Sequence, residues 1–510
     1  MLNWLGKLLR GTSTGAAPAA EPADLVREAL AHRQAGRFGQ AERLLYRALA
    51  LSPAAADIHL QLGDLFRLLG RHDAALDCCL EAVRLAPGLA PARNNLGNAY
   101  RDLGNVERAL AEYRQALALD ERLPEAHFNI GAALQKEGRV EEAGRHYRDA
   151  LRLKPDFALA QLNLGFLLEE QADVAGAIAA YAGATAADPE LVEAHVNLGM
   201  QLLLAGRLAE GWKEYEWRLR YPEYSGADAA AAAPRWNGAG LEGQAILLDA
   251  EQGFGDAIQF LRYAPMVAAR GGRVLVRCAP DLAELAAGVE GVAAVVPRGA
   301  ALPAFDAYCP LPSLPYVLGT TLETIPAKLP YLHADPAKAA RWQAKFAADG
   351  GGVRIGLVWA SQSLHRTAAD KSVGLAALAP LAEMPGVRFY SLQKGAAAAE
   401  RPPAGLALRD LSVDLRDFAD TAAAVAGLDL VVSVDTAVAH LAGALGKPVW
   451  TLLKFAPDWR WLMARADCPW YPGMRLFRQR RPASWDSVLE ELVPAIRQFV
   501  DAASTRRGGA

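Results

Sequence analysis

The residue best suited to acid–base chemistry is Asp256, which follows the apolar segment 245–250. Gly253 and Gly255 permit a tight turn just before it. A partly buried carboxylate there can act as a general base toward an acceptor hydroxyl. The alternative is that Asp256 only caps the next helix, a position that aspartate favours. The complete G-x-G-x-x-G fingerprint is absent, which disfavours a dinucleotide cofactor.

A second cluster follows the apolar segment 428–434 and consists of Asp435, Thr436, Ala437 and His440. A helix that opens here presents free main-chain N–H groups and the positive end of its dipole, which together suit a diphosphate. We expect these residues to bind the diphosphate group of a ligand. The alternative is an aspartate that caps the helix and a histidine that packs in the core.

Three further polar residues complete the set of candidates. Lys371 adds a cation that can stabilise a departing diphosphate, and we group it with Asp256 as catalytic. Gln393 and Lys394 end the apolar segment 387–392, and we expect them to contact the nucleotide. No Asp-x-Asp motif stands at the end of an expected strand, so we expect neither a metal ion nor a cofactor.

Parallel sheets are needed to place these residues. Continuous apolar segments separated by helical stretches predict parallel strands that are covered on both faces. They occupy residues 245–250, 274–276, 293–296, 353–360, 387–392, 428–434 and 448–453. The segments divide into two sets between residues 330 and 352, and a closing helix is expected near 484–503. We therefore predict an α/β region of two Rossmann-like halves, which bind ligands beyond the carboxyl ends of their strands.

The first half of the chain repeats with a period of 34 residues. Glycines mark the period at Gly63, Gly97, Gly131, Gly165 and Gly199. Small residues stand twelve positions after each of the first four glycines, where they let two helices approach closely. The last unit departs, because Gly211 replaces the small alanine and Trp212 follows it. We expect the second helix of that unit to pack on a different neighbour.

This period resembles the tetratricopeptide repeat, a helix–turn–helix unit that stacks into a solenoid. A carboxamide stands two residues before each glycine, at Gln61, Asn95, Asn129, Asn163 and Asn197. Amides on that face can pair with the main chain of a protein or peptide in the groove of the array. The arrays of O-linked N-acetylglucosamine transferases carry a similar ladder, which binds protein substrates. The alternative is that the amides pair with neighbouring units and only fix their stacking.

The second half of the chain resembles the ADP-heptose:lipopolysaccharide heptosyltransferases. Asp435–Ala442 is similar to the D-T-x-x-x-H-x-A signature of that family, and Gly253–Asp256 matches its glycine turn and catalytic aspartate. Gly356–Trp359, Lys371–Ser372 and Ser391–Lys394 also match in order. The resemblance implies the GT-B fold, a nucleotide-diphosphate sugar as donor substrate and inversion at the anomeric centre. It also implies which residues bind the nucleotide sugar: Gly253, Gly255, Gln393, Lys394, Asp435, Thr436, Ala437 and His440. Ala437 and Val438 stand where the family has Gly-Pro, and the family lacks such repeats, so its heptose donor and lipid acceptor are not carried over.

Two tryptophan-rich motifs near the C-terminus, Asp458–Trp461 and Pro469–Pro472, resemble those of bacterial repeat–glycosyltransferase fusions. The resemblance assigns them no role. We expect buried tryptophans that support the site, with sugar stacking as the alternative.

Composition narrows the classes of function. The net charge is −3, which gives no basic excess for nucleic acid, and no apolar run is long enough for a transmembrane segment. Five cysteines at irregular spacing fit neither a disulfide framework nor a zinc site, so we expect a cytoplasmic protein, with peripheral membrane association through its first residues left open. The predicted domains are a tail (1–21), the repeat array (22–225), a linker (226–242), and two GT-B halves (243–335 and 336–505).

Together these features predict a glycosyltransferase that moves a sugar from a nucleotide-diphosphate donor to a protein or glycan acceptor recruited by the array. We expect the reaction to be inverting and metal-independent. The alternative is a non-catalytic scaffold in which the repeats bind partners and a degenerate GT-B domain is only structural. Binding of a nucleotide sugar distinguishes the two.

Overall fold

The computed structural model describes residues 21–225, 232–362 and 371–508. The expected tail, with its open question of membrane association, and residues 226–231 of the expected linker lie outside the described residues, apart from Glu21. The chain divides into two units by its internal contacts, and each is described by itself. One comprises Met1–Leu167 and Ala179–Pro189, and the other comprises Leu168–Ile178 and Glu190–Ala510.

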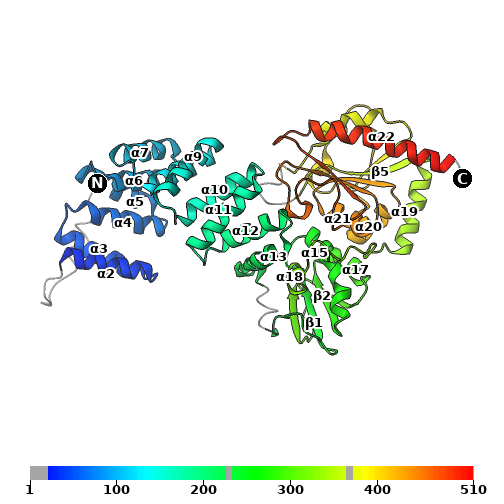
Figure 1. Ribbon diagram of the computed structural model, residues 1–510, viewed down its shortest axis with the longest axis horizontal. Helices are drawn as coiled ribbons and strands as arrows, with labels where there is room; N and C mark the ends of the chain where they lie inside the picture. The colour runs from blue at the N-terminus through cyan, green and yellow to red at the C-terminus, as the bar shows by residue number, and fades with distance from the viewer. Residues whose placement is uncertain (1–20, 226–231, 363–370, 509–510) are drawn as a thin grey trace. The chain divides into compact units, whose positions relative to one another are not determined.

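Each repeat unit forms a helical hairpin of two helices, and the hairpins follow one another along the chain (Figure 1). The helices are α2 (Pro22–Gln34), α3 (Phe38–Leu51), α4 (Ala56–Leu68), α5 (His72–Leu85), α6 (Ala90–Asp102), α7 (Val106–Leu119), α8 (Pro124–Lys136), α9 (Val140–Leu153), α10 (Ala158–Glu170), α11 (Val174–Ala187), α12 (Val192–Leu204) and α13 (Leu208–Tyr215). This arrangement confirms the predicted helical repeats. The helical hairpin α12–α13, which the period assigns to the array, falls in the second unit.

The period of the glycines has a packing cause. A Cβ atom on Gly97 would lie 2.5 Å from Cε1 of Tyr113, and one on Gly131 would lie 2.7 Å from Cε1 of Tyr147. Both tyrosines are fully buried. The first helix of these units therefore needs a residue without a side chain where the ring from the second helix lies against it. At Gly63 and Gly199 the close neighbours are instead Sγ of Cys79 and the main-chain nitrogen of Tyr215.

A second periodic position, which the sequence analysis did not use, joins the two helices of each unit. Its residues have a left-handed backbone and are Gly36, Gly70, Gly104, Gly138, Ala172 and Gly206. Glycine suits this position because it adopts a positive φ without a steric cost.

Two all-parallel sheets make up the α/β region of the second unit (Figure 1). The first sheet has the order β3-β2-β1-β4, with β1 (Ala245–Asp249), β2 (Arg273–Cys278), β3 (Val292–Pro297) and β4 (Ala307–Pro310). The second has the order β10-β9-β8-β5-β6-β7, with β5 (Val353–Val358), β6 (Val387–Ser391), β7 (Leu408–Asp410), β8 (Leu430–Val434), β9 (Val449–Leu453) and β10 (Met474–Arg478). The predicted α/β region with two sets of strands is confirmed.

Helices connect and cover these strands. They are α15 (Phe254–Phe260), α16 (Ala264–Ala268), α17 (Pro280–Ala287), α18 (Leu314–Val317), α19 (Pro336–Ala348), α20 (Phe418–Ala426), α21 (Ala437–Ala444) and α22 (Asp486–Gly508). The closing helix is thus longer than expected at its end. Two 3₁₀ helices matter below: η2 (Glu216–Arg220) follows α13, and η8 (Trp459–Trp461) follows β9. No helix in the described part of the chain has the length and apolar content to cross a bilayer.

The structure adds features that the apolar segments did not reveal. Strands β4, β7 and β10 were not expected, because the first two are short and β10 alternates apolar residues with arginine rather than forming an apolar run. Within the expected linker, Arg235 forms a β-bridge with Tyr308, and Trp236 is only 5% exposed. This part of the segment therefore packs on the first sheet.

The last repeat unit packs as the sequence predicted, on a different neighbour. Helix α13 has 8 residues, whereas α3, α5, α7, α9 and α11 each have 14. The Trp212 ring meets the rings of Phe260 and Trp459 edge-on, with centroids 6.3 and 5.2 Å away. These rings belong to α15 and η8, so α13 is part of the core of the α/β region.

We expect Gly97→Ala to lower the free energy of unfolding by about 1 kcal/mol, the middle of the overpacking cost less the helix gain. Alanine favours a helix over glycine by about 1 kcal/mol, but the contact with Tyr113 requires overpacking that costs about 1–3 kcal/mol. Urea unfolding followed by far-UV circular dichroism measures the change. Gly88→Ala is the control, because a Cβ there meets nothing within 4 Å, and a neutral Gly97→Ala would contradict the packing account.

Candidate functional site

The two sheets meet through the helices that follow β1 and β8. Gly255 lies in the first turn of α15, and a Cβ on it would lie 3.1 Å from Cδ2 of His440 and 3.8 Å from Cα of Ala437. The start of α15 therefore lies directly against α21. This contact explains Gly255 by close packing, whereas Gly253 is the N-cap of α15 with an ordinary φ of −69°.

Asp256 lies in the first turn of α15 and does not occupy the N-cap position. Its carboxylate pairs with the guanidinium of Arg460, which comes from η8 in the other half. Arg460 also donates to Oδ1 of Asp458 at 2.8 Å and to Oε1 of Gln259 at 2.7 Å. One buried arginine thus joins two carboxylates and an amide across the two halves.

Burial and charge act in opposite directions on these carboxylates. Burial raises the pKa of Asp256 against the opposing effect of Arg460, and the negative charge of Asp458 adds to the rise. Burial would also raise the pKa of Asp458, but Arg460 and Lys371 outweigh it and lower that pKa below its ordinary value. Asp256 is therefore the more basic of the two carboxylates, as a general base requires.

Lys371 forms an ion pair with the second cluster. Its Nζ donates to Oδ2 of Asp435 at 2.7 Å, and the two side chains are 21% and 12% exposed. Burial alone would lower the pKa of Lys371, but Asp435 and Asp458 outweigh it and raise that pKa. The ammonium group therefore stays charged beside the start of α21.

The first turn of α21 has main-chain N–H groups without an acceptor in the described part of the chain. Thr436 is the N-cap, but its hydroxyl bonds to Oγ of Ser433 at 2.9 Å and does not cap the helix. Within the described residues, the N–H groups of Ala437 and Val438 have no acceptor. Together with Lys371, they form a positively polarised surface that suits a phosphate group.

His440 is a buried residue of the core. It is 4% exposed, its Nδ1 lies 2.9 Å from the hydroxyl of Tyr471, and its ring stacks on Trp461 with centroids 5.1 Å apart. Burial lowers its pKa to about 3, with Arg460 as a second cause. This is the arrangement that the core alternative describes, and contact of His440 with a nucleotide stays a prediction.

Gln393 and Lys394 hold the ends of strands and loops. The Gln393 side chain is 1% exposed; it accepts from the N–H groups of Trp359 and Ala360 and donates to two carbonyl oxygens. Nζ of Lys394 donates to the carbonyl oxygens of Ser412 and Leu415, both at 2.8 Å. Their polar groups are engaged by the main chain, and their expected contact with a nucleotide is untested.

The tryptophans of the two C-terminal motifs are buried, as predicted. Trp459, Trp461 and Trp470 are 3%, 0% and 1% exposed. Arg262 of the first half donates to the carbonyl oxygen of Trp470 at 2.6 Å and to the hydroxyl of Tyr331 at 3.0 Å. These contacts form a second link between the halves beside the Arg460 contacts.

The carboxamide ladder is engaged mostly within the array. Asn95 donates to Oδ1 of Asp64 at 3.0 Å, and Asn129 donates to Oδ1 of Asn94 at 2.9 Å. Gln61 accepts from Arg33, Asn129 also accepts from Arg101, and Asn163 donates to the hydroxyl of Tyr147. Asn197 is 7% exposed, and its Nδ2 has no hydrogen-bond partner within the described residues. Four of these amides have the partners that the stacking alternative describes, and peptide binding by the ladder stays a prediction.

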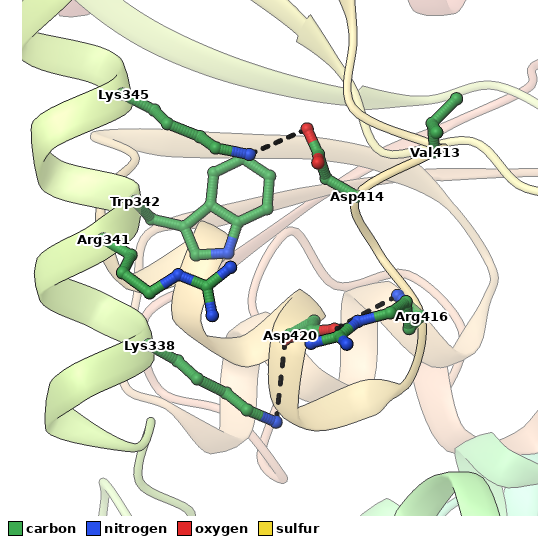
Figure 2. A pocket seen from close by; sticks show the side chains of 8 residues that line it. All are labelled: Lys338, Arg341, Trp342, Lys345, Val413, Asp414, Arg416 and Asp420. Atoms are coloured by element: carbon green, nitrogen blue, oxygen red, sulfur yellow. Dashed lines mark hydrogen bonds and ion pairs between the residues drawn. The ribbon is translucent and has the colours of Figure 1, made fainter.

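A cavity of about 260 Å³ lies apart from these clusters, between α19, α20 and the preceding loop (Figure 2). It is lined by Lys338, Arg341, Trp342, Lys345, Val413, Asp414, Arg416 and Asp420. Lys345 pairs with Asp414 at 2.9 Å, and Arg416 pairs with Asp420 at 2.9 Å (Figure 2). None of the candidate site residues lines it.

Segments in both parts of the chain match known protein families. Residues 26–90 and 124–157 match the tetratricopeptide repeat, and residues 97–138 match the TPR repeat. Residues 393–461 match glycosyltransferase family 9 (heptosyltransferase). This match includes Asp435 and Arg460, whereas Asp256 and Lys371 lie outside it. The predicted resemblance to tetratricopeptide repeats and to heptosyltransferases is confirmed, and the family 9 match supports a glycosyltransferase.

Similar individual proteins include protein FlbA of Caulobacter vibrioides, which is 30% identical over 323 residues. The alignment covers 58% of this chain and 54% of FlbA, so the chain spans about half the length of that relative. Among solved structures, a TPR protein of Thermus thermophilus is 23% identical over 36% of this chain and 99% of its own, with a TM-score of 0.33. PilF of Pseudomonas aeruginosa is 21% identical over 41% of this chain and 97% of its own, with a TM-score of 0.35.

We expect His440 to make the protein less stable as the pH falls below its ordinary pKa of 6.5. The unfolded chain binds a proton on this ring near pH 6.5, whereas the folded protein resists protonation until about pH 3. The contribution of His440 to the free energy of unfolding is therefore fully present above pH 6.5 and is lost on acidification. The loss amounts to about 2 kcal/mol between pH 7 and pH 5. His440→Gln removes this titration, so its unfolding free energy should fall by about 2 kcal/mol less over the same interval. Urea unfolding at both pH values compares the two proteins, and an equal fall in both would show that His440 is not buried in its neutral form.

Proposed function

We propose that the chain is an inverting glycosyltransferase that moves a sugar from a nucleotide-diphosphate donor to a hydroxyl acceptor. The observation that carries this proposal is the meeting of α15 and α21. It places a carboxylate with a raised pKa, Asp256, close to a helix start with free N–H groups and to the Lys371 cation. The proposed base comes from the first half and the proposed diphosphate site from the second.

The donor diphosphate would lie at the start of α21. The N–H groups of Ala437 and Val438 and the ammonium group of Lys371 would bind its oxygens and stabilise the charge that develops on departure. Lys371 now pairs with Asp435, so a phosphate would compete with that carboxylate for it. These groups supply positive charge at the diphosphate, which supports the proposal of metal-independent transfer.

Asp256 would take the proton from the acceptor hydroxyl. As the hydroxyl oxygen bonds to the anomeric carbon, the bond from that carbon to the diphosphate oxygen breaks and the nucleoside diphosphate leaves. Attack from the face opposite the leaving group inverts the anomeric centre. Arg460 divides its positive charge between Asp256 and Asp458, so Asp256 keeps more basicity than an exclusive ion pair would leave it.

The repeats would recruit the acceptor, a protein or glycan. Tetratricopeptide repeats suggest interaction with protein, because stacked units form an extended surface. Four of the ladder amides have partners in the array, so an acceptor that used them would exchange these bonds for its own. We propose a cytoplasmic location, which the five buried free cysteines support because thiols persist in a reducing compartment.

A thermal-shift screen of the full chain against UDP-, GDP- and ADP-sugars tests the proposal. We expect one nucleotide class to raise the melting temperature by about 4 °C at a concentration one hundred times its Kd. Asp256→Asn should keep this shift but lower sugar transfer by at least about 100-fold, since it removes the base while it keeps the side-chain size and leaves Asp458 and Gln259 as acceptors for Arg460. The shift should be lost in Lys371→Met, which removes the cation at the diphosphate.

Lys345→Met is the matched control for the lysine variant. It also removes a lysine from an ion pair with an aspartate, at the cavity away from α21, and it should keep the shift. The absence of a shift with every nucleotide sugar would contradict the proposal and favour the scaffold alternative. Full transfer by Asp256→Asn would place the base elsewhere.

A further inference from the structure

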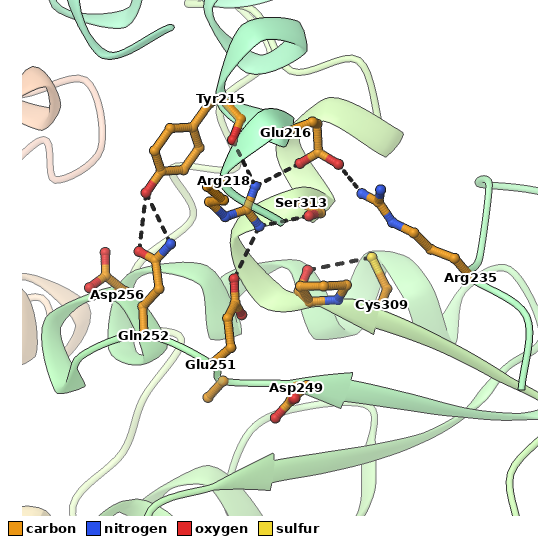
Figure 3. A network of polar contacts seen from close by, with 12 residues as sticks. Tyr215, Glu216, Arg218, Arg235, Asp249, Glu251, Gln252, Asp256, Cys309 and Ser313 are labelled. Carbon is orange, nitrogen blue, oxygen red and sulfur yellow. Dashed lines mark hydrogen bonds and ion pairs between the residues drawn. The ribbon is translucent and has the colours of Figure 1, made fainter. Parts of the chain in front are cut away.

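Segment 212–218, at the end of the repeats, touches both halves of the proposed site. On one side, the Tyr215 hydroxyl lies 3.1 Å from Oε1 and 3.0 Å from Nε2 of Gln252, in the loop between β1 and Asp256 (Figure 3). On the other side, the rings of Tyr215 and Trp212 contact Trp459, the residue between Asp458 and Arg460.

Arg218 reaches the same loop from η2. Its side chain is 1% exposed, and its Nη2 donates to Oε1 of Glu251 at 3.1 Å and to Oγ of Ser313 at 2.7 Å (Figure 3). Its Nη1 donates to Oε1 of Glu216 at 2.8 Å. The bonds to Glu216 and Ser313 hold the planar guanidinium in one orientation, and its bond to Oε1 then fixes the position of the Glu251 side chain.

The Glu251 carboxylate needs this partner. It is 3% exposed, and burial raises its pKa to about 7 against the opposing effect of Arg218. Its other oxygen, Oε2, has no hydrogen-bond partner within the described residues. Without Arg218, a buried carboxyl would lie unpaired at the carboxyl end of β1, where the loop to Asp256 begins.

We propose that Tyr215 and Arg218 are positioning residues for the loop 250–256, so that the last repeat unit is a working part of the transferase site. The inference rests on the proposed function, in which Asp256 is the base. The two residues touch neither substrate nor reacting atoms; they hold Gln252 and Glu251, and thereby set where Asp256 lies relative to Arg460 and α21. The short α13 has the same explanation, since its early end lets η2 enter the region beside β1.

Hydrogen–deuterium exchange of the full chain tests this role without any substrate. Tyr215→Phe keeps the ring and its packing but removes the bond to Gln252. The peptide that covers 250–258 should exchange about fivefold faster in this variant, the factor that corresponds to one lost hydrogen bond. Arg218→Lys keeps the charge but loses the fork, so it should speed exchange in the same peptide.

The matched control is Tyr263→Phe. It removes the hydroxyl of a buried tyrosine of the first half, which bonds to Oγ1 of Thr320 at 3.0 Å and has no bond to the loop. This variant should leave exchange over 250–258 unchanged. Unchanged exchange in Tyr215→Phe, or an equal increase in Tyr263→Phe, would overturn the inference.

With the donor from the nucleotide screen, Tyr215→Phe should lower kcat about fivefold and leave the KM for the donor unchanged. A purely structural role would instead leave kcat unchanged in the folded fraction, which would also overturn the inference. The two proposals fail separately. A negative nucleotide screen with fast loop exchange contradicts the proposed function, whereas transfer with unchanged loop exchange contradicts the role of Tyr215 and Arg218.

Discussion

The proposed site depends on the contacts of one buried cation, Arg460. Its guanidinium pairs with Asp256 of the first half, with Asp458 beside it, and with the amide of Gln259. A buried arginine requires several acceptors to offset its desolvation, and here they come from both halves. The same contact thus joins the two sheets and sets the charge around the proposed base.

Other features keep this contact in place. Gly255 lets α15 lie against α21, and Arg262 ties the first half to the main chain at Trp470. Trp212 fills the junction with aromatic rings from both halves. The end of the repeat array therefore belongs to the same core that supports the proposed site. Loss of packing there should displace the loop before Asp256 and, with it, the proposed base.

The sequence could predict the repeats, the two sheets and several polar residues near the start of α15 and α21, because local patterns carry that information. Asp256 and Asp435 follow apolar strands, and ligands gather at the ends of such strands. Arg460 could not be assigned, because its partner lies 204 positions away and only the folded chain brings them together. Gln393 is polar and follows a strand, as a ligand-binding residue would, but neighbouring carbonyl and N–H groups form hydrogen bonds with its amide. Strand β10 was missed because it lies at the edge of the sheet, and its apolar residues alternate with arginines and form no continuous apolar run.

The most direct test of the account is the pH dependence of kcat/KM for sugar transfer, which reports the free enzyme. In the unaltered protein, the acidic limb should lie above the ordinary aspartate range, because burial raises the pKa of Asp256. Asp458→Asn removes a negative charge that raises the pKa of Asp256. It also leaves Asp256 as the only carboxylate of the pair that still shares the charge of Arg460. The account predicts that the acidic limb moves to lower pH in Asp458→Asn. An unchanged limb would contradict the claim that Arg460, shared by two carboxylates, tunes Asp256 as the base.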